Sequence, residues 1–354
     1  MNIDNISEIK SGDPQDMLHH ILALPDQLET AWKLGGQVSL GSGDGIRQVI
    51  IAGMGGSAIG ADLIEAYVKT ICSVPVVVHR DYGLPAWAND NHTLVIASSH
   101  SGNTEETLSA YDAALERKCR CIALCTGGAL KEKAVASGSP VMQFVHDGQP
   151  RAAVGFSFGL ILAAFAGLHL IPDQEKKLHG AVAVMLNQMK SLIPESLVSD
   201  NPAKRLAGQL LGRFPVVVGA DILTPVARRW KGQFNEVAKS WSQFDSLPEF
   251  DHNSLAGLDR PEKVLNQMVV VFLKADANQK NNQLRVDLSR QVMMTEGINT
   301  DIVTARGEND LEQVWSLVNL GDFTAYYLAC LSETDPTPIP AISLLKQEIQ
   351  RARS

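Results

Sequence analysis

Apolar runs alternate with stretches of helical periodicity along the first half of the chain. The runs that read as strands lie at residues 48–52, 75–79, 93–97, 120–124 and 141–145. Helices are expected at 58–69 and 108–115. An amphipathic lead-in helix at 16–34, with Pro25 as the candidate position of a break, precedes the first strand. Strands that alternate with helices predict a parallel sheet with helices on both faces.

The same pattern starts again after 194–202, a polar stretch with prolines that we interpret as a domain junction. Further strands are predicted at 214–219, 264–274 and 302–305, and further helices at 221–241, 282–295, 311–330 and 341–353. We therefore expect an α/β fold of two doubly wound parallel-sheet units with flanking N- and C-terminal helices. The expected divisions are a lead-in at 1–36, a first unit at 37–172, a helical linker at 173–200, a second unit at 201–333 and a C-terminal helix at 334–354.

Composition and charge narrow the classes of function. The net charge of -8 argues against a protein that binds nucleic acid regardless of sequence, because such a protein needs a basic face. The longest apolar stretch, Phe156 to Ile171, is too short to span a bilayer and contains His169, so we expect a buried helix and no membrane segment. The five cysteines are an odd number without framework spacing, which predicts reduced thiols in the cytoplasm. Cys119, Cys121 and Cys125 are close enough to suggest a metal site, but no histidine completes the set and buried structural thiols are favoured.

The stretch from Ser98 to Thr107 carries several hydroxyls and one glycine between a predicted strand and a predicted helix. The start of the helix favours an anion, and Ser99, Ser101 and Thr104 can donate hydrogen bonds to the same anion. No lysine follows the glycine, so this is no P-loop, and the simplest ligand is a phosphate monoester. The alternative is a helix N-cap by Ser101 or Thr104, which explains one or two of these residues but not the whole cluster.

The first strand is followed by another turn that can face a ligand, Gly53-Met54-Gly55-Gly56-Ser57, which we call the glycine turn. Glycine lets the backbone approach a ligand closely. The spacing from Gly53 through Gly55 to Ala58, with Asp81 further on, also fits a dinucleotide-binding fingerprint. A dinucleotide-dependent oxidoreductase is therefore an alternative. It gives no role, however, to the hydroxyl-bearing stretch from Ser98 to Thr107, which we call the hydroxyl loop.

Together, these two motifs resemble the signature of sugar isomerase (SIS) domains. Four later segments make the resemblance specific: 150–153 (Pro-Arg-Ala-Ala), 235–239 (Asn-Glu-Val-Ala-Lys), 248–253 (Pro-Glu-Phe-Asp-His-Asn) and 335–338 (Asp-Pro-Thr-Pro). With them, nearly the whole chain resembles the bifunctional phosphoglucose/phosphomannose isomerases of archaea and bacteria. The resemblance implies two SIS domains of flavodoxin-like fold, hexose 6-phosphate substrates and a homodimer.

The resemblance also implies roles for individual residues. The phosphate-binding positions match Gly55, Gly56, Ser57, Ser99, Ser101 and Thr104. Glu236 matches the base, His252 and Lys346 match groups for ring opening, and Arg151 matches an arginine beside the enediolate. His252 is expected to reach the partner subunit's site, and Thr337 is a candidate for the threonine linked to accepting both epimers. No cofactor and no metal are expected.

Position alone allows plainer readings of the same residues. Glu236 can pair with Lys239 or Ser240 on a helix surface, and His252 can bond to a neighbour in its loop. Arg151 can extend outward from a rim, and Lys346 can be solvated. A sugar-phosphate sensor without activity is a further alternative, although no basic recognition helix is found in the first part of the chain.

Overall fold

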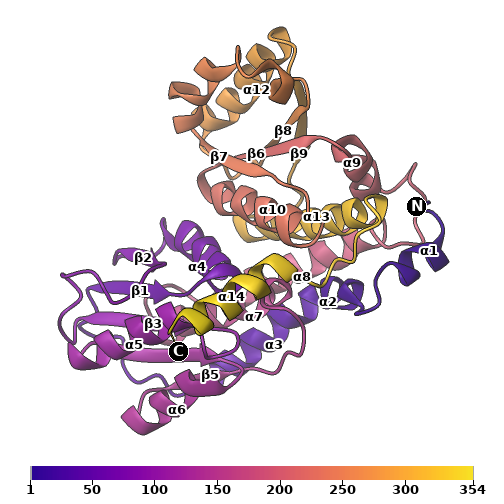
Figure 1. Ribbon diagram of the computed structural model, residues 1–354. Coiled ribbons are helices and arrows are strands. Elements are labelled where there is room, and N and C mark those ends of the chain that lie inside the picture. The colour runs from indigo at the N-terminus through magenta and orange to yellow at the C-terminus, as the bar shows by residue number, and fades with distance from the viewer. Residues whose placement is uncertain (1, 354) are drawn as a thin grey trace.

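The computed structural model describes residues 2–353 and contains two parallel sheets (Figure 1). The first sheet has the strand order β2-β1-β3-β4-β5. Its strands are β1 (Gln48–Ala52), β2 (Val76–His79), β3 (Thr93–Ser98), β4 (Arg120–Cys125) and β5 (Val141–Gln143). The chain starts in β1, adds β2 on one side and then crosses to β3 on the other. This order places a switch point beside the end of β1, where ligands of doubly wound sheets bind.

The second sheet repeats this order with one strand fewer, as β7-β6-β8-β9. Its strands are β6 (Phe214–Ala220), β7 (Gln243–Leu247), β8 (Met268–Lys274) and β9 (Asn299–Thr304). All pairings are parallel. The expected α/β class with two parallel-sheet units is therefore confirmed.

A layer of helices lies between the two sheets and joins them (Figure 1). The layer consists of α3 (Leu24–Gly36), α4 (Gly55–Val68), α7 (Val154–Gly167), α8 (Glu175–Met189), α10 (Thr224–Glu236) and α13 (Asp310–Leu331). Strand residues of both sheets, such as Ile96 and Val271, belong to the same buried cluster as these helices. One hydrophobic core thus runs through both units and positions the first turn of α4 against α10.

The outer face of each sheet has its own smaller core. The helices α5 (Glu105–Glu116) and α6 (Gly128–Ser137) cover the first sheet. The second sheet is covered by α11 (Glu262–Leu265), α12 (Lys280–Thr295) and the short 3-10 helices η3 (Glu249–His252) and η4 (Ser254–Gly257). Alternate residues of each central strand enter different cores, which explains why the strands read as unbroken apolar runs.

The expected buried helix at 156–171 is α7, and every residue from Val154 to Phe165 is buried. The next helix, α8, lies within the stretch expected to be a linker, 173–200, and packs against both α3 and α13. The two units and α8 share one hydrophobic core, and no gap in the packing of residues 2–353 marks a boundary. The expected boundaries at 172 and 200 therefore stay a prediction.

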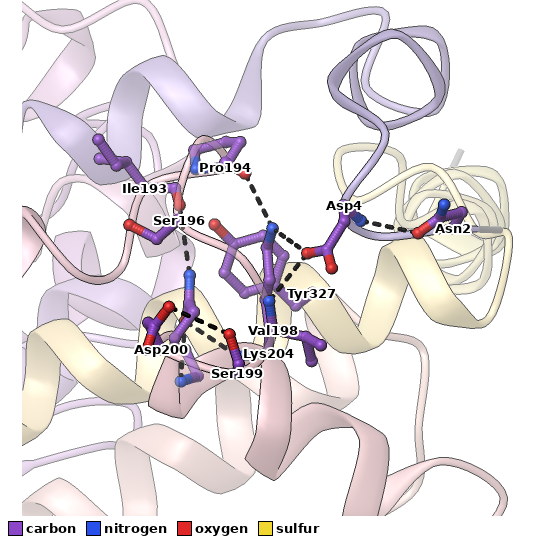
Figure 2. A network of polar contacts seen from close by, with 12 residues as sticks. Asn2, Asp4, Ile193, Pro194, Ser196, Val198, Ser199, Asp200, Lys204 and Tyr327 are labelled. Atoms are coloured by element: carbon purple, nitrogen blue, oxygen red, sulfur yellow. Dashed lines mark hydrogen bonds and ion pairs between the residues drawn. The ribbon is translucent and has the colours of Figure 1, made fainter.

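The N-terminal segment is fastened to the second unit by a buried lysine (Figure 2). Lys204, on α9 (Pro202–Leu210), is fully buried and donates from Nζ to Asp4 Oδ1 at 3.0 Å and to the carbonyl of Pro194 at 2.8 Å. The ammonium also lies 5.4 Å from the ring centroid of Tyr327 on α13. A buried ammonium needs such partners, so removal of Asp4 would leave an uncompensated charge. The short helices α1 (Ile6–Ser11) and α2 (Met17–Leu22) follow this anchor.

Several predicted boundaries are wrong. The lead-in helix is divided between α2 and α3 at Ala23, and α1 was not expected. The helix expected at 221–241 begins as a 3-10 turn, η2 (Asp221–Leu223), and ends at Glu236, because Lys239 takes a left-handed φ of 53° and turns the chain into β7. Within this stretch, the apolar side chains of Val226, Trp230, Phe234 and Val237 are buried, but Trp241 is 72% exposed. The strand expected from 264 begins at Met268, after α11.

The last helix, α14 (Pro340–Arg353), extends along the first unit with all of its residues exposed (Figure 1). Its end is held by Arg353, whose Nη1 donates to both carboxylate oxygens of Glu105 at 2.5 and 2.6 Å. The helix thereby reaches the first turn of α5, which follows the hydroxyl loop.

Candidate active site

A cavity of about 290 Å³ opens between the first turn of α4 and the helix α10. Its lining includes Gly55 and Gly56 from the first unit, Arg151 from the 3-10 turn η1 (Pro150–Ala152), and Glu236 from the second unit. The remaining lining residues are Ile59, Arg80, Arg228, Arg229, Lys231, Gly232, Gln233 and Phe244. Five basic side chains and one carboxylate belong to this lining. Arg80 and Arg228 pair with Asp62, and Arg229 pairs with Asp322, so Arg151 and Lys231 are the lining cations that can favour an anionic ligand.

Glu236 is the last residue of α10, and its side chain is 32% exposed. Its Oε2 lies 3.8 Å from Nη1 of Arg151. The buried side chains of Trp230 and Phe234 hold the preceding turns of α10 in the core. The carboxylate is therefore fixed at the edge of the cavity and remains open to a ligand.

Arg151 is 3% exposed, and its guanidinium connects the cavity to the start of the C-terminal segment. Nη2 donates to the carbonyl of Pro336 at 3.0 Å and to that of Thr337. Burial lowers the pKa of Arg151, and the nearby carboxylates of Glu236 and Asp335 oppose this effect. Its Nε has no hydrogen-bond partner among residues 2–353. An arginine held in this way retains donors for a ligand in the cavity.

A buried ion pair supports Arg151 from behind. Arg229 donates to Asp322 from Nε at 3.1 Å and from Nη2 at 2.5 Å, and Gln233 donates to the same carboxylate at 3.0 Å. Nη2 of Arg229 also donates to the backbone carbonyl of Arg151 at 3.2 Å. This ion pair was not predicted from the sequence. The available signal was Asp322, a carboxylate inside the otherwise uncharged stretch 313–331 of α13.

The hydroxyl loop after β3 is organised by its own side chains. Ser99 Oγ accepts from the backbone N–H of Gly102 at 3.1 Å and donates to Thr104 Oγ1 at 2.9 Å. Thr104 is the N-cap residue of α5, but no side-chain cap hydrogen bond is formed. The simple N-cap reading is therefore wrong, and the hydroxyl of Thr104 points back into the loop.

Glycine is required where this loop and the glycine turn meet their neighbours. Gly102 has a φ of 70°, and a Cβ there would lie 1.8 Å from the carbonyl oxygen of Gly127. A Cβ on Gly56 would lie 2.4 Å from the carbonyl oxygen of Pro150, so only glycine lets η1 rest on α4. Ser57 Oγ accepts from the N–H of His100 at 3.1 Å and ties the turn to the hydroxyl loop. The two motifs therefore form one continuous surface next to Arg151.

Two of the expected residues lie elsewhere in the chain. His252 ends η3 in the second unit and is exposed, and Lys346 is exposed on α14. Neither residue lines the cavity, and the expected phosphate-binding residues Ser57, Ser99, Ser101 and Thr104 do not line it either. Of the expected site residues, the cavity brings together Gly55, Gly56, Arg151 and Glu236. By contrast, Thr337 is 6% exposed beside Arg151, and its Oγ1 has no partner within the described chain.

Two further findings concern membranes and metals. Among residues 2–353, no helix is long and apolar enough to cross a membrane. The same residues contain no group of three or more His, Cys, Asp or Glu side chains arranged to hold a metal ion.

All five cysteines are free, and burial raises the pKa of Cys119, Cys121 and Cys125. These thiols are therefore poor nucleophiles and contribute to packing.

Known proteins match the chain over nearly its full length. Residues 199–349 match the family model "Bacterial phospho-glucose isomerase C-terminal SIS domain", and residues 45–135 match the SIS domain model. The bifunctional phosphoglucose/phosphomannose isomerase of Caldicellulosiruptor bescii is 39% identical, over 94% of this chain and 98% of the relative. The enzyme of the same name from Aquifex aeolicus is 30% identical, over 86% and 90%.

Solved structures show the same fold at low identity. A hypothetical protein from Thermus thermophilus aligns with a TM-score of 0.76 at 16% identity, over 98% of this chain and 92% of that protein. A glucose-6-phosphate isomerase like protein from the same organism aligns with a TM-score of 0.65 at 21% identity, over 96% and 98%.

Proposed function

The chain belongs to the family of bifunctional phosphoglucose/phosphomannose isomerases, and on this premise we propose that it interconverts glucose 6-phosphate and mannose 6-phosphate with fructose 6-phosphate. The observation that carries the proposal is the pairing of Glu236 with Arg151 in one cavity next to the glycine turn and hydroxyl loop. The two aldoses differ only at C2 and give the same enediol. One base and one phosphate site therefore serve both substrates.

Glu236 is the proposed base of this reaction. Its carboxylate removes the proton from C2 of the open-chain aldose, and the electrons of that bond form the C1–C2 double bond of the enediol while O1 gains a proton. Return of a proton to C1 and loss of the proton on O2 gives the ketose. Arg151 stabilises negative charge that develops on O1 and O2, since its guanidinium faces Glu236 at 3.8 Å and is buried enough that water screens its charge little. No metal takes part in these steps.

The phosphate is proposed to lie against Gly55, Gly56 and the hydroxyls of Ser57, Ser99, Ser101 and Thr104. Backbone N–H groups at the start of α4 and neutral hydroxyls suit a phosphate dianion. The phosphate is thereby held at a distance from Glu236, so that binding and proton transfer rest on different residues.

Thr337 is the proposed reason that both epimers are accepted. Its hydroxyl is buried next to Arg151 without a partner among the described residues, and a hydroxyl can both donate and accept. It can therefore contact the substrate O2 in either configuration.

His252 and Lys346 are proposed to open the sugar ring. Because neither lines the cavity of its own chain, His252 is proposed to act in the site of the partner subunit of a homodimer. Support comes from α12, beside η3, where the large apolar side chains of Leu284, Leu288 and Val292 are 55%, 50% and 46% exposed at helical spacing. A second chain would cover this face. The five free thiols agree with the reduced cytoplasm as the proposed location.

A coupled assay with each aldose phosphate separately tests the activity. We expect fructose 6-phosphate from both substrates, and activity that is unchanged by a metal chelator. Binding of fructose 6-phosphate without turnover would instead support a sugar-phosphate sensor. Substrate-dependent reduction of NAD would support the oxidoreductase.

A further inference from the structure

Lys239 occupies the turn that ends α10, three residues after Glu236, and the reaction described above gives it no role. Its backbone has a φ of 53°, in the left-handed region. Its Nζ donates to the backbone carbonyl of Glu236 at 2.9 Å and to that of Val237 at 3.4 Å. The N–H of Ser240 donates to the carbonyl of Phe234 at 2.9 Å and closes the same turn.

Lysine seldom adopts this backbone conformation, although Lys118 after α5 has it too, with a φ of 58°. Left-handed residues at helix C-termini are commonly glycine or asparagine, and a longer side chain makes the backbone strained. Strain of this kind is found where the residue supplies something else, often at a functional site. The turn itself does not need lysine, so the contribution of Lys239 lies in its ammonium group.

The ammonium of Lys239 lies at the negatively charged end of α10, next to Glu236. The last carbonyls of α10 carry partial negative charge, and the Glu236 carboxylate is at the same end of the helix. These like charges repel each other and favour rotation of the carboxylate away from the helix end. An ammonium bonded to the last carbonyls opposes that repulsion.

We propose that Lys239 is a positioning residue of the isomerase, whose ammonium fixes the end of α10 and keeps the Glu236 carboxylate opposite the Arg151 guanidinium. The proposal rests on the proposed function, since it assigns Lys239 to the same reaction. It adds a residue that acts through Glu236 and does not itself touch the substrate.

Charged groups from three elements face this ammonium: Arg151 on η1, Glu236 on α10 and Asp335 in the segment after α13. Although Lys239 is exposed, partial desolvation of its ammonium and the charge of Arg151 lower its pKa to about 8, against the opposing effect of Asp335 and Glu236. Lys239 therefore loses its charge as the pH rises through about 8. Because the neutral amine cannot offset the negative helix end, kcat is expected to fall over the same range.

The test compares Lys239→Met, Lys239→Arg and Lys239→Gly over pH 6–10. We expect Lys239→Met to lower kcat by about tenfold with little change in KM, and to remove the alkaline fall of kcat. Lys239→Arg keeps a positive charge at every pH, so it should restore most of kcat and move the alkaline fall beyond the range. Lys239→Gly relieves the backbone strain without supplying charge, and it should behave as Lys239→Met does. Wild-type kcat and pH dependence in Lys239→Gly would overturn the proposal.

A crystal structure of Lys239→Met without substrate separates this proposal from the proposed function. We expect Glu236 Oε2 to move away from its position 3.8 Å from Arg151 Nη1. An unmoved carboxylate would overturn the positioning role even in an active enzyme. If the wild-type protein does not isomerise hexose phosphates, the proposed function fails, and the position of the carboxylate still decides whether Lys239 holds it.

Discussion

Arg151 and Glu236 come from different halves of the chain and face each other across one cavity, with Nη1 and Oε2 3.8 Å apart. This separation is too long for a hydrogen bond, so the donors of Arg151 are not used up by the carboxylate. An oxygen of the substrate can take the remaining donor while the carboxylate approaches the adjacent carbon. Arg151 also donates to the carbonyls of Pro336 and Thr337, so one side chain links the carboxylate that we propose as the base to the start of the C-terminal segment.

The first prediction concerns the fork-shaped guanidinium of Arg151. Lys is a single point of charge and cannot hold two carbonyls and a ligand together, so Arg151→Lys is expected to lower kcat by at least about tenfold. Steady-state kinetics with fructose 6-phosphate measures this loss. The matched control is Arg120→Lys, because Arg120 also donates to two backbone carbonyls, those of Ser42 and Asp44. Equal kcat values for both variants would remove Arg151 from the mechanism.

The second prediction concerns the phosphate site. Ser57→Ala and Thr104→Ala each remove one neutral donor, which should raise KM by about two- to tenfold and leave kcat nearly unchanged. Ser196→Ala, which removes a hydroxyl that donates to the nearby carbonyl of Lys190, serves as the control. If both site variants bind fructose 6-phosphate as the wild type does, the phosphate lies elsewhere.

The third prediction uses a pair of imidazoles beneath the hydroxyl loop. His100 Nε2 lies 2.9 Å from His146 Nδ1, and His20 lies against His146 with ring centroids 5.1 Å apart. Burial lowers the pKa of His146 to about 4, with added effects of His100 and His20 and an opposing effect of Asp147. Burial lowers the pKa of His100 as well.

Between pH 6.5 and about 4, the unfolded chain therefore binds more protons at His146 than the folded chain does. The free energy of unfolding falls as the pH decreases through this range. We expect His146→Gln to weaken that dependence by on the order of 1 kcal/mol between pH 7 and pH 5 in urea unfolding. His179→Gln, at an exposed position on α8, is the control. If the free energy of unfolding of His146→Gln depends on pH as that of the wild type does, the lowered pKa of His146 is not the cause of this dependence.

The fourth prediction tests whether two chains share a site. Mixed dimers of Glu236→Gln and His252→Asn chains contain one site with both residues intact, but only if His252 acts in the partner subunit. Equal amounts of the two inactive variants, unfolded and refolded together, should recover about a quarter of wild-type activity. Separate refolding of each variant is the control. No recovery in the mixture would place His252 in the site of its own chain, and full activity of His252→Asn refolded alone would remove His252 from the mechanism.

The features that could be predicted from the sequence are those that depend on residues close to one another along the chain. The strands were found because successive residues, such as Ile50 and Ile51, enter different cores and leave no polar position. The hydroxyl loop and the glycine turn were found because their backbone requirements are local. The contact of Ser57 with His100, which joins them, follows from the order of β1 and β3 in the sheet.

Other features depend on contacts that no local pattern records. The end of α10 was missed because Lys239, and not glycine, takes the left-handed conformation there. Strand β7 was missed because its residues Gln243 to Ser246 are only partly buried or exposed. The support of Arg151 by Arg229 and Asp322 joins α10 to α13 across 93 residues of chain. Spacing alone cannot predict such a pair.

Glu236 is the centre of the account, and its replacement by Gln keeps the shape of the side chain while preventing proton uptake. The most direct measurement follows deuterium from solvent into C2 of glucose 6-phosphate and mannose 6-phosphate formed from fructose 6-phosphate in D₂O. We predict deuterium at C2 of both products with the wild type. With Glu236→Gln, incorporation and turnover should both fall by about 10²–10⁴-fold while binding of fructose 6-phosphate is kept. A Glu236→Gln enzyme that isomerises and exchanges at near the wild-type rate would contradict the assignment of Glu236 as the base.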